Sequence, residues 1–174
     1  KARMKASTLR KRLSKYLRRT YNHYLLNDNI ILNGEKLETW DPLYLSDPKV
    51  KILQDQTIIH KDCKIKVVAS YLGDCTGPDL QPKGVDSRNR NQGGYISRAS
   101  RLMTENPLTD SNGLTGFYAA HHDYRNLRWS VSYCPKADDY MGTSSRKDGV
   151  NIEQSLNDKI ALSEYIGEKC ANEG

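Results

Sequence analysis

The sequence predicts an α+β fold, in which four to six short strands form a sheet and two substantial helices lie on one of its faces. Apolar residues recur with helical periodicity near both ends of the chain, but they alternate with polar residues, as in half-buried strands, across the middle. The length of 174 residues fits one domain with a core of its own. We therefore expect residues 1–174 to fold as a single domain.

The first predicted helix has Ser7 or Thr8 as its N-cap and runs to about Leu26. Its apolar positions recur every four residues and are expected to form a buried stripe. The stripe consists of Leu9, Leu13, Leu17, Tyr21 and Leu25, widened by Tyr16, Thr20 and Tyr24.

Basic residues are concentrated in the same segment. Residues 1–19 hold nine of the 27 Lys and Arg residues and no acid. The rest of the chain therefore has 18 basic and 21 acidic residues and is close to neutral. One interpretation is a solvated helix face whose aliphatic stems cover the edge of the core. The other is a phosphate-binding ridge. The candidate nucleic-acid contacts of that ridge are Arg10, Lys11, Arg12, Lys15, Arg18 and Arg19.

Strands are expected on both sides of Asn33-Gly34, a strong hairpin signal because both turn positions need a positive φ. Residues 42–52 are expected to be irregular or extended. Further strands are predicted at 63–72, 94–103 and 126–135. In the last of these, Leu127, Trp129, Val131 and Tyr133 alternate with Arg128, Ser130 and Ser132.

Polar connections separate these elements. Residues 73–94 form a long Gly-, Pro- and Asn-rich loop of a kind that is usually functional or mobile. Residues 136–141 are expected to form a short acidic turn, and residues 142–150, GTSSRKDGV, a polar surface loop that carries Arg146 and Lys147. A final helix is predicted from about Ile152 to Cys170, with Leu156, Ile160, Ser163 and Ile166 as its buried stripe.

Common catalytic motifs are missing from the sequence. It contains no GxSxG, no HExxH and no Gly-rich phosphate loop that ends in Lys-Ser/Thr. His121-His122 is best interpreted as part of a surface turn, and Asp138-Asp139 as the start or end of a short helix. The four dispersed cysteines, Cys63, Cys75, Cys134 and Cys170, lack zinc-ligand spacing, so free thiols and no metal site are expected. The chain alone does not look like a complete enzyme.

The sequence also bears on location. No apolar stretch is long enough to cross a membrane, and no signal-peptide pattern follows Lys1, so we expect a cytoplasmic protein that does not contact membranes. Because the first residue is not Met, we expect a piece of a longer protein.

Three ordered stretches resemble the domain that follows the ATP-binding domain in the GHKL superfamily of ATPases, which includes the gyrase, heat-shock-chaperone, histidine-kinase and MutL types. The first, "TLRKRLSKYLRRTYNHYLLNDNIILNGEKLETWDPLYL", is similar to a segment of MORC-like and bacterial heat-shock-type members. The second, "GGYISRASRLM", is similar to the family strand "GFYVYRNNRLI" at Gly93, Tyr95, Arg98, Arg101 and Leu102. The third, "YRNLRWSVSYCPKADDYMGTSSRKDGVNIEQSLNDKI", resembles the strand, acidic turn, loop and closing helix of the same proteins.

This resemblance implies a transducer domain with the fold of the second domain of ribosomal protein S five, about four mixed strands backed by helices. It implies an ATP-binding domain ahead of residue 1 as partner, with ATP and Mg²⁺ held by the parent protein and not by this chain alone. A family loop lysine that contacts the γ-phosphate corresponds to Lys147, and Arg146 is a candidate assistant. A homodimer and DNA are further implied partners.

Three functions are therefore weighed. The first is a transducer that senses the γ-phosphate of ATP through Lys147 and relays the nucleotide state to partner domains. The second is a nucleic-acid-binding module that uses the basic helix, against which stands the lack of aromatic residues presented for base stacking. The third is an interaction scaffold without a nucleotide role, which would expose an apolar patch to its neighbour.

Overall fold

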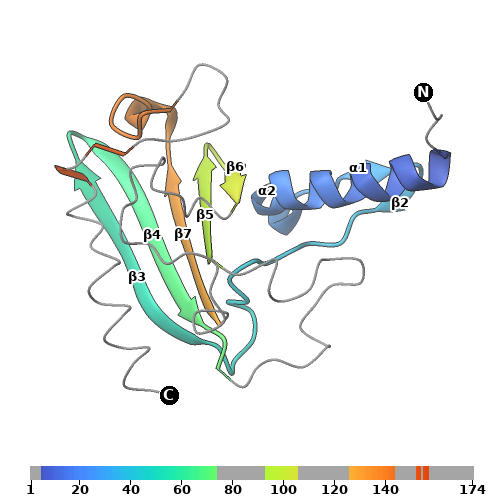
Figure 1. The fold of residues 1–174 in the computed structure, drawn as a ribbon, viewed down its shortest axis with the longest axis horizontal. Helices are drawn as coiled ribbons and strands as arrows, with labels where there is room; N and C mark the ends of the chain where they lie inside the picture. Colours follow the sequence, from blue (N-terminus) through green and yellow to red (C-terminus); the bar gives the residue numbers. More distant parts are fainter. Residues whose placement is uncertain (1–4, 74–92, 106–125, 144–151, 154, 157–174) are drawn as a thin grey trace.

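A five-stranded mixed sheet forms the centre of the computed structural model, which describes residues 5–73, 93–105, 126–143, 152–153 and 155–156 (Figure 1). The strands are β3 (Lys51–His60), β4 (Cys63–Tyr71), β5 (Gly93–Arg98), β6 (Arg101–Glu105) and β7 (Leu127–Tyr133), in the order β3-β4-β7-β5-β6. All neighbours are antiparallel except β5 and β7, which are parallel. The α+β class is confirmed, with five strands in this sheet where about four are expected.

One face of the sheet carries the larger apolar core. Ile65 and Val67 of β4 pack there with Trp129 and Val131 of β7, all of them almost fully buried. The chain that follows β7 covers this face, because Ala137, Met141, Ile152 and Leu156 belong to the same cluster. The alternation predicted for residues 126–135 is therefore confirmed on its apolar side.

The opposite face is covered by the N-terminal part of the chain. Trp40 and Leu43 pack against Val68 of β4, Tyr95 of β5 and Leu102 of β6. Helices α1 (Ala6–Thr20) and α2 (Asn22–Asn27) lie beside β6, and α1 extends away from the sheet (Figure 1). None of the described helices is long and apolar enough to span a membrane.

The first helix differs from the prediction in three ways. It is interrupted at Tyr21, whose φ of −116° and ψ of 27° separate α1 from α2. Its N-cap is Lys5, without a side-chain capping bond, because Ser7 and Thr8 already lie inside the first turn. The predicted stripe is largely exposed in α1: the exposed fractions of Leu9, Leu13 and Tyr16 are 56%, 40% and 53%, although Leu25 in α2 is buried.

Three hairpins shape the rest of the fold. The predicted turn at Asn33-Gly34 is confirmed, with φ of 54° and 79°, and it joins β1 (Ile31–Leu32) to β2 (Glu35–Lys36). Lys61-Asp62 forms a similar left-handed turn between β3 and β4, and the prediction missed β3 beyond residue 52. Residues 94–103, predicted as one strand, instead form the β5–β6 hairpin around Ala99-Ser100.

Several predictions lie wholly or mostly outside the described residues. These are the loop at 73–94, the turn at His121-His122, the loop that carries Arg146 and Lys147, and the final helix, of which only Ser155 and Leu156 are described as helical.

Candidate functional site

The chain leaves β7 through a turn that is tied back to β5. Pro135–Ala137 forms a 3₁₀ turn that ends at Asp138, as the helix-terminus interpretation of Asp138-Asp139 predicts. The Arg98 guanidinium donates two hydrogen bonds to the Asp138 carboxylate, Nε to Oδ1 at 2.6 Å and one terminal nitrogen to Oδ2 at 2.7 Å. This bond raises the pKa of Arg98 above its ordinary value. Two stretches that carry the family resemblance therefore meet at this ion pair.

The start of segment 144–151 is fixed on the same end of the sheet. Met141 is buried, Gly142 takes a positive φ of 55°, and the Thr143 amide donates to the Asp138 carbonyl at 3.0 Å. The Thr143 hydroxyl lies 2.8 Å from the Tyr133 hydroxyl at the end of β7. Burial raises the pKa of Tyr133, so this phenol stays protonated and able to donate.

The end of segment 144–151 is fixed by the turn between β3 and β4. The Glu153 amide donates to the Tyr140 carbonyl at 2.9 Å, and the Lys61 ammonium donates to the Glu153 carboxylate at 3.2 Å. Lys61 also lies 4.4 Å from the centre of the Tyr140 ring. Hydrogen bonds from Ser155 and Lys61 lower the pKa of Glu153. Arg146 and Lys147 themselves lie outside the described residues.

The six candidate nucleic-acid contacts of α1 separate into two groups. Arg10, Lys11 and Arg12 are exposed, and Lys15 is half-buried. Arg10 forms an ion pair with Glu35 of the β1–β2 hairpin. The basic ridge therefore persists along the outer part of α1.

Arg18 and Arg19 serve the packing of the domain instead. Each is only 8% exposed. The Arg18 Nε donates to the Glu38 carbonyl at 2.9 Å, and the Arg19 guanidinium carbon lies 4.7 Å from the centre of the Trp40 ring. A buried cation stacked on an indole stabilises the junction of helix and sheet rather than facing a solvent-side phosphate.

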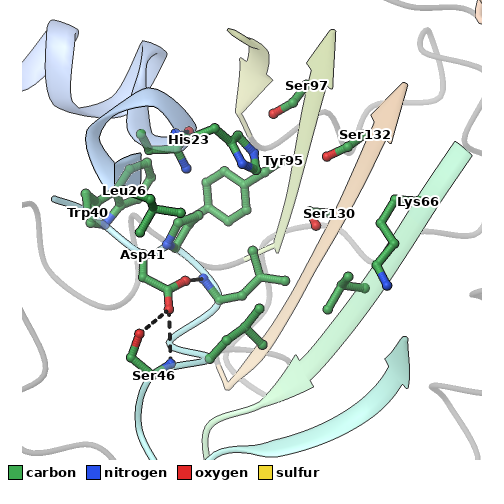
Figure 2. Close-up of a pocket in the computed structure, with 15 residues that line it drawn as sticks. His23, Leu26, Trp40, Asp41, Ser46, Lys66, Tyr95, Ser97, Ser130 and Ser132 are labelled. Carbon is green, nitrogen blue, oxygen red and sulfur yellow. Dashed lines mark hydrogen bonds between the residues drawn. The ribbon is translucent and has the colours of Figure 1, made fainter. Parts of the chain in front are cut away.

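A pocket of about 360 Å³ lies between α2, the segment from Trp40 to Ser46 and the second face of the sheet (Figure 2). The strand register gives its floor two rows. Lys66, Ser132 and Ser97 stand side by side on β4, β7 and β5, and Val68, Ser130 and Tyr95 form the next row. Leu26, Trp40 and Leu43 are among the residues that form its apolar walls.

Asp41, Lys66 and His23 line this pocket, and each interacts with neighbouring groups. The Asp41 carboxylate accepts hydrogen bonds from the Leu43 amide at 3.0 Å and the Ser46 amide at 3.3 Å. Lys66 forms an ion pair with Asp55 of β3. Burial lowers the pKa of His23, an effect that the nearby Asp41 carboxylate partly opposes, so the imidazole is neutral near pH 7.

Sequence reasoning missed this pocket. The signal available was the alternation in 126–135, which sets Ser130 and Ser132 opposite the apolar face. What the sequence could not supply was the register that aligns these serines with Ser97 and Lys66.

In the described residues, no group of three or more His, Cys, Asp or Glu side chains could hold a metal ion.

No protein-family model, curated protein or solved structure matches this chain.

Proposed function

We propose that this chain is the transducer domain of a GHKL-type ATPase, with the ribosomal-protein-S-five second-domain fold in a five-stranded form. Lys147 contacts the γ-phosphate of an ATP molecule held with Mg²⁺ by a separate ATP-binding domain, and Arg146 positions the loop. A compact ammonium on a flexible stem suits a terminal phosphate, and the contact would change when that phosphate is lost. The site acts in the cytoplasm.

The observation that carries this proposal is the anchoring of both ends of segment 144–151. Thr143 is held by Tyr133 and Asp138, and Glu153 is held by Lys61 and Tyr140. Loops that bind ligands are commonly mounted in this way on a rigid scaffold. Asp138 and Glu153, the carboxylates beside these anchors, are each neutralised by a cation, which reduces their repulsion of a phosphate.

The same contacts offer a route for the nucleotide signal. A displacement of the loop would move Asp138, which is bonded through Arg98 to the β5–β6 hairpin. It would also move Glu153, which is bonded through Lys61 to the β3–β4 hairpin. In this proposal the relay reaches the partner domains, or the second subunit of a homodimer, through these two hairpins.

The test joins this chain to its proposed ATP-binding domain and compares Lys147→Ala with the unaltered protein. We expect ATP turnover to fall by roughly 10² or more, because loss of one phosphate-directed donor usually has such an effect, and ATP-dependent dimerisation to weaken. Lys136→Ala is the matched control, since Lys136 is an exposed lysine on the preceding turn. Arg146→Ala measures the assisting role separately. Unchanged turnover and unchanged dimerisation in Lys147→Ala would reject the proposal.

A nucleic-acid-binding role is the second candidate, and the exposed basic part of α1 favours it. Because Arg18 and Arg19 are buried, we expect at most four phosphate contacts, from Arg10, Lys11, Arg12 and Lys15, and Arg10 must exchange Glu35 for a phosphate to make its contact. Affinity for duplex DNA should then fall with salt at a log–log slope of about −3.6.

The salt titration has its control in the same helix. Changing Lys11 and Arg12 to Ala should reduce the magnitude of the slope by about two, one unit for each lost contact. The absence of DNA binding at low salt would contradict this candidate and leave the cluster as a solvated face.

A further inference from the structure

A separate function is suggested by the pocket between α2 and the sheet, which plays no part in the ATPase proposal. Its volume of about 360 Å³ falls in the range of small-molecule sites. Figure 2 shows Trp40, Leu26 and Tyr95 close together on one side of the pocket, and Ser97, Ser130 and Ser132 to their right on β5 and β7. The pocket therefore combines an aromatic side with a polar floor.

The aromatic side is held rigidly. The rings of Trp40 and Tyr95 meet edge to face with their centres 5.5 Å apart, and Arg19 lies over the Trp40 ring. Trp40 is 1% exposed and Tyr95 is 2% exposed, so neither ring can turn away. Such a preformed surface suits the flat face or edge of a ring.

Trp40 also has an unused hydrogen-bond donor. Within the described part of the chain, its buried indole Nε1–H has no hydrogen-bond acceptor. A buried unpaired donor is costly, and most such groups in folded proteins find a partner. An indole N–H can only donate, so the missing partner must carry an acceptor such as a carbonyl oxygen.

The polar floor supplies hydroxyl groups without a net charge. Ser97 and Ser132 stand opposite each other on parallel neighbours β5 and β7, with Lys66 next to them on β4. Lys66 is paired with Asp55, and Asp41 on the far side accepts hydrogen bonds from backbone amides. An anionic ligand would lose its hydration here without gaining an unpaired cation, and the Asp41 carboxylate would repel it.

We propose that this pocket binds a small molecule that carries no negative charge and has a flat apolar ring and a carbonyl-type acceptor. The ring lies against Trp40, Tyr95 and Val68, and its polar edge faces the hydroxyl groups of Ser97 and Ser132. The acceptor receives the Trp40 indole N–H.

Benzamide is a suitable probe, because it is a small molecule with all of these features and has an anionic counterpart of the same shape, benzoate. The chain contains two tryptophans, so its nitrogen-15 spectrum holds two indole N–H signals, which Trp40→Phe assigns. We expect benzamide to shift the Trp40 signal saturably with a Kd of about 1 mM. The signal of Trp129, which lies in the core on the other face, should stay in place. Benzoate should bind at least tenfold more weakly.

Two matched variants show where the probe binds. Ser132→Leu places an apolar side chain in the floor of the pocket and should abolish the shift. Thr57→Leu makes the same kind of change on the neighbouring strand, opposite Lys66 and outside the pocket lining, and should leave binding unchanged. The proposal is overturned if the Trp40 signal shows no saturable shift, if benzoate binds as tightly as benzamide, or if Ser132→Leu still responds. A pocket filled by another part of the chain would give the first of these results.

Discussion

At the scale of single residues, the ion pair between Arg98 and Asp138 connects two of the three sequence stretches on which the functional proposal depends. A guanidinium that forms two parallel bonds with a carboxylate fixes orientation as well as distance. The exposed fractions of the Arg98 and Asp138 side chains are 18% and 31%, so solvent screens the pair only in part. Its main consequence is to hold the start of the turn that precedes segment 144–151.

We predict that Arg98→Ala lowers the midpoint of thermal unfolding and increases hydrogen exchange at the Thr143 amide. The physical reason is that the Asp138 carboxylate loses its two hydrogen bonds from Arg98, and the Asp138 carbonyl is the acceptor for that amide. Arg101→Ala is the control, because Arg101 is exposed on the adjacent strand β6. Equal effects of the two variants on both measurements would show that the ion pair does not fix the turn.

At the scale of elements, strands could be predicted where apolar and polar residues alternate. In β7, Leu127, Trp129, Val131 and Tyr133 all point into one core, and the alternation survives in the sequence. In β3 the burial pattern is weak because it is an edge strand with polar residues at Gln54, Asp55 and Gln56. That strand was therefore missed.

The hairpins show a second limit. Asn33-Gly34 predicts its turn because both residues tolerate a positive φ. Ala99-Ser100 adopts the same conformation with φ of 46° and 63° although neither residue favours it, so β5 and β6 were predicted as one strand. The pairing of the two strands imposes this turn, and pairing cannot be read from a short segment.

Close packing between strands gives the prediction at this scale. A Cβ atom on Gly94 of β5 would overlap the indole ring of Trp129, which is 1% exposed and cannot move aside. We expect Gly94→Ala to reduce the free energy of unfolding by about 3 kcal/mol, measured by denaturant titration.

Gly34→Ala is the comparison for this variant. Gly34 has a φ of 79° and nothing near its absent Cβ, so only backbone strain of about 1 kcal/mol is expected. If Gly94→Ala is no more destabilising than Gly34→Ala, the indole of Trp129 does not pack on β5 as described.

At the scale of the whole molecule, the sheet is covered on both faces by chain from opposite ends of the sequence. The segment after β7 covers the larger core, and the N-terminal segment covers the face that contains the pocket. The α+β class and most strands followed from local patterns. The burial of Arg18 and Arg19 did not, because it depends on Glu38 and Trp40, which only the folded chain brings to them.

The candidate sites were predictable to a smaller degree. The family resemblance directs attention to Lys147, but the anchors at Thr143 and Glu153 depend on contacts with Tyr133 and Lys61 that sequence spacing does not reveal. The exposed Leu9, Leu13 and Tyr16 on α1 are the kind of apolar surface that a neighbouring domain would cover. In the transducer proposal, the ATP-binding domain is that neighbour.

The most direct test of the central claim is the affinity of the joined protein for a non-hydrolysable ATP analogue relative to ADP, measured by calorimetry with and without Lys147→Ala. If Lys147 contacts the γ-phosphate, the variant should bind the ATP analogue at least tenfold more weakly, a loss of about 1.4 kcal/mol, and bind ADP with unchanged affinity. Lys136→Ala should bind both nucleotides normally. Unchanged affinity of Lys147→Ala for the ATP analogue, or an equal loss for both nucleotides, would contradict the account.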